Sequence, residues 1–282
     1  MNFERRDFFR FTKLGLMATA ASPLMGAGFL STNEHVKDFL WLDKKSGKDD
    51  VLTDVALPKH EAVILRGKEY LTLKKTLYRL KRIQKTVGYG HFNVISFDEA
   101  LKLANRYSNI GEFSKDELNL VEKLFYENAN VYGFYGEKVL ASLTADIKTN
   151  ETTKIPYTGH YLYRGRAEAM YQQIKKDIGR SIVLTSGVRG VVKQMYLFLN
   201  KAYKLEGNLS EASSSLAPPG YSFHGIGDFD VGKVGFGIKN FSSDFAETDE
   251  YKRLMDLGYI KIRYFEGNPF GVRFEPWHIK VI

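Results

Sequence analysis

Residues 222–230 read SFHGIGDFD, and residues 275–278 read EPWH. Together these stretches hold two histidines, two aspartates and a glutamate that lies three residues before the second histidine. Two imidazoles and one carboxylate are a common ligand set for catalytic zinc, which keeps a further position for water. The pattern predicts metal-assisted hydrolysis, and it narrows the function more than any other part of the sequence.

The composition is that of a basic globular protein without cysteine. The chain has 282 residues, 44% hydrophobic and 14% aromatic, which is enough to bury a core in one or two domains. Without cysteine, disulfides and thiolate ligands are excluded, so a metal must use His, Asp or Glu. The net charge of +8 indicates either an ordinary basic surface or attraction to an anionic polymer. No nucleic-acid-binding module accompanies it, and we expect no nucleic-acid partner.

The densest basic stretch, residues 74–85, reads KKTLYRLKRIQK. Helical spacing relates Leu73, Leu77, Leu80 and Gln84. The stretch therefore predicts an amphipathic helix whose basic face lies in solvent.

The first residues resemble an export signal. Arg5 and Arg6 are followed by one residue and two phenylalanines, a pattern similar to a twin-arginine signal. The apolar stretch 14–30 is short and interrupted by Pro23, so it predicts no stable membrane span after processing. We expect residues 1–30 to be read by the Tat export machinery and the protein to be periplasmic or otherwise exported. The alternative is an ordinary amphipathic segment.

The rest of the chain divides into a linker and two structured regions. Residues 31–60 are polar without a sustained period and are typical of a linker or loosely docked arm. Residues 61–150 have a mainly helical pattern, in which capping boxes begin helices at Ser96 and Ser114. A polar break then precedes a second domain, residues 155–282.

This second domain mixes helices with short strands. Its patterns predict helices over 166–178, 191–202 and 247–257, and strands over 181–185, 229–238, 259–265 and 271–274. Short strands joined by brief turns favour an α+β fold, a small antiparallel sheet with flanking helices that follows the mainly helical N-terminal region.

The candidate ligands are His224, Asp230 and His278, with Asp228 competing for the carboxylate position. The metal would lower the pKa of its bound water toward neutrality, and Glu275 would take the water proton and pass it to the leaving amine. A bend between Glu275 and His278 would bring both side chains to one cavity. The remaining histidines lack an acidic partner at useful spacing, and we expect structural or surface roles for His35, His60, His91 and His160.

Several blocks, in order, resemble the VanY-type zinc D-alanyl-D-alanine carboxypeptidases, which share a fold with the Hedgehog signalling domain. The blocks are SGVR at 186–189 with Gln194 five residues on, APPGYSFH at 217–224, DVG at 230–232 and EPWH at 275–278. The resemblance covers residues 155–282 and implies a Hedgehog/DD-peptidase-like fold. It implies nothing about residues 31–150.

The resemblance also assigns roles to individual residues. It implies one zinc ion on His224, Asp230 and His278, with Glu275 as the base. It implies further substrate-binding residues: Arg189, Gln194, Ser222 and Trp277. An arginine fork binds a carboxylate through two parallel hydrogen bonds, which suits Arg189 as the anchor for a free peptide end. Trp277 is expected either to wall the site or to lie in the core.

The implied function is an exported zinc metallopeptidase that removes the C-terminal D-alanine from peptidoglycan stem peptides. The open alternatives are an L,D-carboxypeptidase, an endopeptidase on the same substrate, or a non-catalytic module that binds cell-wall peptides. The last is motivated by a departure from the family: five residues, not six, separate His224 from Asp230. A one-residue slip reverses a side chain in a strand, so we expect Gly225 and Gly227 to absorb it in a loop.

Overall fold

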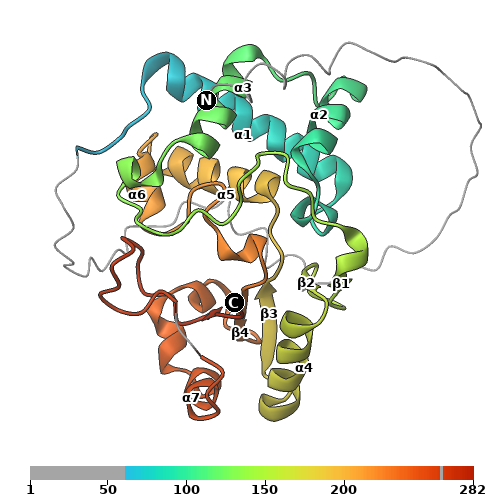
Figure 1. Cartoon of the computed structure of the whole chain (residues 1–282), viewed down its shortest axis with the longest axis vertical. Coiled ribbons are helices and arrows are strands. Elements are labelled where there is room, and N and C mark those ends of the chain that lie inside the picture. The colour runs from blue at the N-terminus through green and yellow to red at the C-terminus, as the bar shows by residue number, and fades with distance from the viewer. Residues whose placement is uncertain (1–60, 261–262) are drawn as a thin grey trace, which may run out of the picture. The chain divides into compact units, whose positions relative to one another are not determined.

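The computed structural model describes residues 61–260 and 263–282 of the chain (Figure 1). Arg5 and Arg6, and with them the predicted signal and linker, lie outside these residues. Among the described residues, no helix combines the length and the apolar character needed to cross a bilayer.

Helices dominate the first part of the described chain. They are α1 (Gly67–Val87), α2 (Phe97–Arg106) and α3 (Lys115–Tyr126). Both predicted capping boxes are confirmed: Ser96 and Ser114 each accept from the backbone N–H three residues on, and the glutamate there reaches back to the serine N–H. These reciprocal bonds satisfy N–H groups that the first helical turn leaves without partners.

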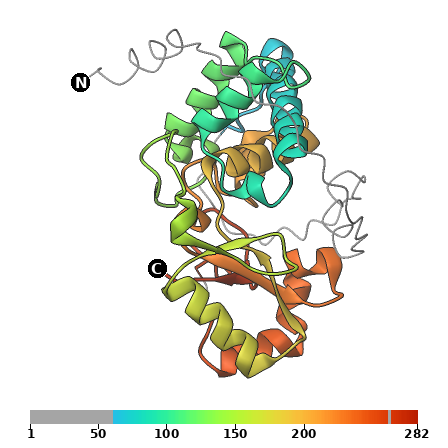
Figure 2. The same ribbon diagram turned by 90° about the vertical axis from the view of Figure 1, so that its right-hand side faces the viewer.

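The basic stretch lies in α1, as predicted. Leu73, Leu77, Leu80 and Gln84 are buried, while most of the lysines and arginines of the helix lie on its outer side. The buried side packs on α3 and on α5 (Val191–Lys204), a helix of the second half of the sequence. Figure 1 and Figure 2 both show α5 among the N-terminal helices.

Two small antiparallel sheets follow. β1 (Thr152–Lys154) pairs with β2 (Tyr161–Tyr163), and the other sheet has the order β3 (Ile182–Ser186), β4 (Phe229–Lys233), β5 (His278–Ile279). In this second sheet Asp230 lies opposite Ser186 on one side and opposite His278 on the other. The predicted α+β class, with a small antiparallel sheet and flanking helices, is therefore confirmed.

The pleat of β4 and β5 separates a core face from a polar face. Phe229, Val231 and Ile279 are fully buried in a hydrophobic cluster with residues of α4 (Arg166–Ile178) and α7 (Asp249–Asp256). Successive side chains of a strand point to opposite faces. Asp230 and His278 consequently share the face that is turned away from this cluster.

The helix predictions of this half agree closely with α4, α5 and α7, but β4 is shorter than predicted. The predicted strand runs to residue 238, whereas β4 ends at Lys233. There the side chain of Asn240 accepts from the Lys233 N–H (2.8 Å) and donates to the Lys233 carbonyl (3.0 Å). The Asn240 side chain thus takes the place of a strand neighbour at Lys233, and one further backbone bond, from the Val234 N–H to the Ser181 carbonyl (2.7 Å), follows.

The predicted strands over 259–265 and 271–274 are wrong for the residues the structure describes. Asn268 instead donates to the carbonyls of Phe265 (2.8 Å) and Val272 (2.7 Å), which closes the chain on itself. The Phe270 carbonyl accepts from the N–H of Tyr135, far away in sequence. Irregular long-range contacts thus replace the expected ladder.

Candidate metal centre

Three buried side chains converge on the polar face of the sheet. His224 comes from a short 3-10 helix, η6 (Phe223–Gly225), Asp230 from β4 and His278 from β5. One ligand atom of each lies within 4.8 Å of the others. The structure therefore brings together all three residues that the sequence proposes as ligands.

The chain reaches Asp230 in spite of its short separation from His224. The backbone N–H groups of Ile226, Gly227 and Asp228 all donate to the Phe223 carbonyl, at 3.1 Å each. Gly227 has a φ of +138°, a conformation that side chains rarely permit. This tight turn sets the direction in which the chain enters β4.

His224 is held by a backbone carbonyl. Its Nδ1 lies 2.9 Å from the Gly187 oxygen and its Nε2 lies 3.2 Å from Asp230 Oδ1. Since a carbonyl only accepts, Nδ1 carries the proton and Nε2 faces the cluster. Gly187 is needed there, because a Cβ would lie 2.0 Å from the Tyr161 carbonyl oxygen.

His278 lies between two carboxylates. Its Nδ1 is 3.1 Å from Asp230 Oδ1, and its Nε2 is 3.0 Å from Asp228 Oδ2. Burial opposes its charge, but the hydrogen bonds to both aspartates raise the pKa of His278 to about 9. Asp228 thus lies behind His278 and does not compete with Asp230 for the centre of the cluster.

Asp230 is the shared anion of the cluster. Burial alone would raise its pKa, but the two imidazoles outweigh burial and hold the pKa of this carboxyl well below its usual range. Its Oδ2 lies 3.5 Å from Arg189 Nη2. The carboxylate therefore stays ionised, as a metal ligand must.

Glu275 enters through a tight turn at Pro276. The Glu275 carbonyl accepts from the His278 N–H (3.2 Å), and the Glu275 N–H donates to the Tyr264 carbonyl (3.0 Å). Burial raises the pKa of the Glu275 carboxyl to about 7, with His278, Arg273, Asp230 and Arg189 close enough to act on its charge. A carboxyl with such a pKa suits a group that takes and returns protons at neutral pH.

Arg189 is buried beside the cluster with one donor unused. Nη1 donates to Gln194 Oε1 (3.1 Å) and Nη2 donates to Ser186 Oγ (3.0 Å). The buried Nε of Arg189 has no hydrogen-bond partner within the protein. An unpaired buried donor costs stability, so this atom marks a place where an anionic group of a ligand would be favoured.

The other predicted substrate-binding residues lie around Arg189 and the sheet. Gln194 uses both ends of its amide, accepting from Arg189 and donating to the Ala217 carbonyl, so it positions the arginine. Ser222 is buried directly before η6. Trp277 belongs to the hydrophobic cluster and meets Phe241 edge to face, which agrees with the core alternative and not with a wall of the site. It lies in the turn directly before β5, where its side chain packs into the core.

The sequence did not predict that Tyr264 lies beside His278, and it did not predict that Asp228 binds the outer nitrogen of the same histidine. The buried ring of Tyr264 lies 5.3 Å from the ring of His278, and burial together with Glu275 raises the pKa of its hydroxyl. No motif marks this tyrosine. His160 is buried nearby, where burial and Lys193 lower its pKa to about 3, so it stays neutral.

The donor set fits a zinc ion. Two imidazoles each have one nitrogen turned to the cluster, and one ionised carboxylate lies between them. This is the borderline nitrogen and oxygen chemistry that zinc accepts, with a ligand number that leaves room for substrate. The three would hold the ion through His224 Nε2, Asp230 Oδ1 and His278 Nδ1.

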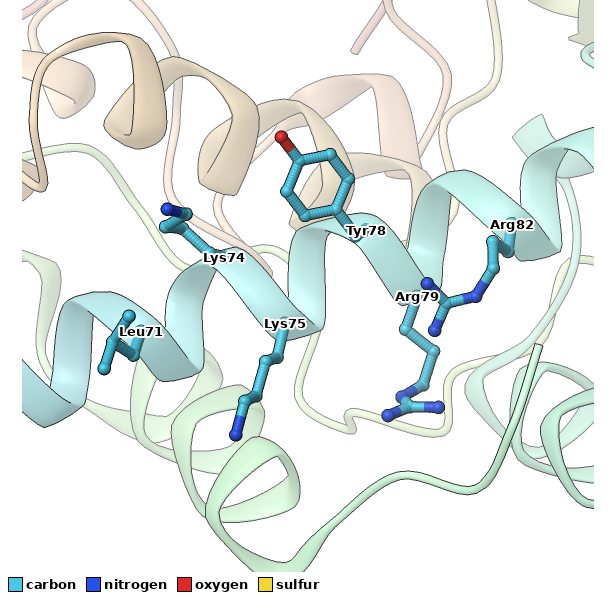
Figure 3. Close-up of a pocket in the computed structure, with 6 residues that line it drawn as sticks. All are labelled: Leu71, Lys74, Lys75, Tyr78, Arg79 and Arg82. Carbon is cyan, nitrogen blue, oxygen red and sulfur yellow. The ribbon is translucent and has the colours of Figure 1, made fainter. Parts of the chain in front are cut away.

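A separate hollow of about 370 Å³ lies on the outer face of α1 (Figure 3). Its lining residues are Leu71, Lys74, Lys75, Tyr78, Arg79 and Arg82. Arg79 is already paired with Glu117 at 2.9 Å, and Arg82 donates to the Ile110 carbonyl. With no carboxylate or imidazole in its lining, this hollow lacks the groups that hydrolysis requires.

A sheet that carries a buried His–Asp–His set beside a half-buried glutamate defines a metal-hydrolase type of centre. Residues 160–282 match the family model VanY, D-alanyl-D-alanine carboxypeptidase. The match supports a VanY-type family for this segment, which covers less than half of the chain, and with it a hydrolase acting on peptide bonds. No curated protein matches the sequence.

Solved structures similar to this chain include three peptidases. A mutant of the vancomycin resistance D,D-pentapeptidase VanY in complex with Zn(II) is 22% identical, with 52% of this chain and 85% of that chain covered and a TM-score of 0.40. The LdcB LD-carboxypeptidase is 23% identical, with 46% and 63% covered and a TM-score of 0.38. The D,D-dipeptidase VanXYg in complex with a D-Ala-D-Ala phosphinate analog is 21% identical, with 52% and 63% covered and a TM-score of 0.38.

Proposed function

We propose that this protein is an exported zinc D,D-carboxypeptidase that removes the C-terminal D-alanine of peptidoglycan stem peptides. The observation that carries the proposal is the unpaired, buried Nε of Arg189 beside the His–Asp–His cluster. A carboxypeptidase needs a cation that recognises the free end of its substrate close to the hydrolytic group. The family match of residues 160–282 supports the same reaction.

The residues divide the work as follows. Arg189, oriented by Gln194 and Ser186, binds the terminal carboxylate and so places the last peptide bond at the cluster. Zinc, when bound, supplies a Lewis acid that polarises the substrate carbonyl and makes water more acidic. Glu275 takes the proton of the attacking water and returns it to the amine of the leaving D-alanine.

The base is tested with Glu275→Gln in the full chain. This variant should retain one zinc per chain and lose hydrolysis by at least about 100-fold, the usual contribution of a general base. Glu247→Gln, a change of the same kind at an exposed residue of the helix η8 (Ser243–Glu247), is the matched control and should keep full activity. A fully active Glu275→Gln variant would remove the glutamate from the mechanism.

The bond that is cut is tested with defined tetra- and pentapeptide muropeptides. Loss of one D-alanine from the pentapeptide supports the proposal. Trimming of the tetrapeptide would identify an L,D-carboxypeptidase, and cleavage of a cross-linked dimer would identify an endopeptidase. Zinc binding without any hydrolysis would identify the module that only binds peptides.

Export is proposed from Arg5 and Arg6 alone. A double change to lysine in the full chain should retain the protein in the cytoplasm, which cell fractionation measures. Unchanged export of this variant would rule out the twin-arginine pathway.

A further inference from the structure

Asp228 is almost completely buried, at 1% exposure, and lies between the blocks 217–224 and 230–232 that carry the family resemblance. Four donors meet its carboxylate. Oδ2 accepts from His278 Nε2 (3.0 Å) and Arg263 Nε (2.9 Å), while Oδ1 accepts from the backbone N–H of Val281 (2.8 Å) and of Ile282 (3.3 Å).

This arrangement determines which nitrogen of His278 carries a proton. Arginine and backbone N–H groups only donate, so both oxygens of Asp228 must accept. A carboxylate without a proton is the form that accepts at both oxygens, and donors meet each of the two oxygens here. His278 therefore donates from Nε2 to Asp228 whether the ring is charged or neutral, so Nδ1 is the nitrogen that would release its proton and bind a metal.

The two histidines are oriented by different means. His224 donates from Nδ1 to the Gly187 carbonyl and turns Nε2 to the cluster, whereas His278 does the opposite with Asp228. A carboxylate behind a histidine ligand fixes its tautomer and raises its basicity more than a neutral carbonyl does. A substitution at Asp228 can therefore test what orients His278, whereas the backbone carbonyl that orients His224 cannot be mutated.

Arg263 in turn holds Asp228 from the outside. Its guanidinium lies over the ring of Phe223, 3.3 Å from the centroid, and its Nη2 donates to the Ile282 carbonyl (2.7 Å). The arginine links η6, Asp228 and the final residues in one arrangement. Its stacked, planar geometry is one that lysine would not reproduce.

We propose that Asp228 is a positioning residue for the metal centre, which selects the Nε2–H tautomer of His278 so that Nδ1 binds the ion. The identity of the ion as zinc rests on the proposed function. Asparagine has one acceptor oxygen and one NH₂ group, which only donates. In Asp228→Asn the NH₂ group must therefore face either the donors His278 and Arg263 or the backbone N–H groups of Val281 and Ile282. Asp228→Asn should therefore lose either the bond to His278 or the bonds to the chain end.

The test is zinc affinity of the full chain, measured by competition with a chromophoric chelator. Asp228→Asn should bind zinc about 10- to 100-fold more weakly than the wild type, the usual effect of removing such a partner. Asp244→Asn, which changes a half-exposed carboxylate paired with Lys239, should bind as the wild type does. Circular dichroism of each variant establishes that it is folded.

A second measurement needs no variant. In the zinc-loaded wild type, ¹⁵N NMR of His278 should show a protonated Nε2 and a metal-bound Nδ1. The reverse assignment, or an unchanged zinc affinity of Asp228→Asn beside an active wild type, would overturn the positioning role alone. A wild type that binds no zinc would overturn the proposed function and this inference with it.

Discussion

Replacement of Arg189 by lysine should separate recognition of the free peptide end from the metal chemistry. Lysine keeps a positive charge near Asp230, now 3.5 Å from the guanidinium, so the buried carboxylate remains compensated. One ammonium cannot serve Gln194, Ser186 and a substrate carboxylate together, as the guanidinium is placed to do. The variant should lose at least one charge-assisted hydrogen bond to the substrate.

Such a bond contributes about 1.5–3 kcal/mol. At 1.4 kcal/mol for each factor of ten, kcat/KM should fall by roughly 10- to 150-fold. The assay compares a pentapeptide that ends in a free carboxylate with the same peptide amidated at its C-terminus. The loss should appear only with the free carboxylate, because the amide gives the arginine no anion to bind.

The zinc content of Arg189→Lys should equal that of the wild type, and Arg253→Lys on the exposed side of α7 serves as the control. Equal losses on both peptides would mean that Arg189 maintains the site and does not recognise the carboxylate. Full activity on the free peptide would refute the anchor altogether.

Three further outcomes are expected. Burial raises the pKa of Glu275 to about 7, so kcat/KM should fall about tenfold per pH unit as the pH drops below that pKa and the base becomes protonated. The positive charge of zinc should move the midpoint of this pH profile lower. A flat profile between about pH 5 and 8 would contradict the assignment. Trp277→Ala should lower the free energy of unfolding by about 3–5 kcal/mol in urea titrations, as loss of a core side chain does, and a negligible change would return Trp277 to the surface of the site. Ser114→Ala should cost about 1 kcal/mol in the same titration through loss of the cap, and no change would mean that the box is not needed in α3.

Features encoded over a few residues could be predicted from the sequence. The capping boxes at Ser96 and Ser114 need only a serine and a glutamate three residues apart, and both occur as predicted. The helix over 166–178 agrees with α4 at both ends. The convergence of His224, Asp230 and His278 could also be predicted. The motifs that contain these residues resemble those of a family in which the corresponding residues bind one metal ion.

Features that depend on distant partners could not be predicted. β4 ends where the Asn240 side chain substitutes for a strand, which no alternation of residues 229–238 reveals. Trp277 lies in the turn before β5, and its burial depends on distant partners such as Phe241. The register between β4 and β5 places Asp230 opposite His278, while Asp228 lies behind His278, so the sequence alone left these two aspartates in competition.

The packing of α5 has a consequence for how the protein can be divided. The start of α5 adjoins Arg189 and Gly190, and the Gly190 N–H donates to the carbonyl of Asn93 at 2.8 Å. Further along, Phe198 and Leu199 are fully buried, Phe198 lies against the ring of Tyr132, and α5 as a whole packs on α1. A fragment cut to the family-matched residues would expose this apolar side and release the loop that holds the arginine. The family-matched residues 160–282 are therefore not a complete folding unit. Residues before them, including α1 and Asn93, must fold together with α5 to hold Arg189 in place.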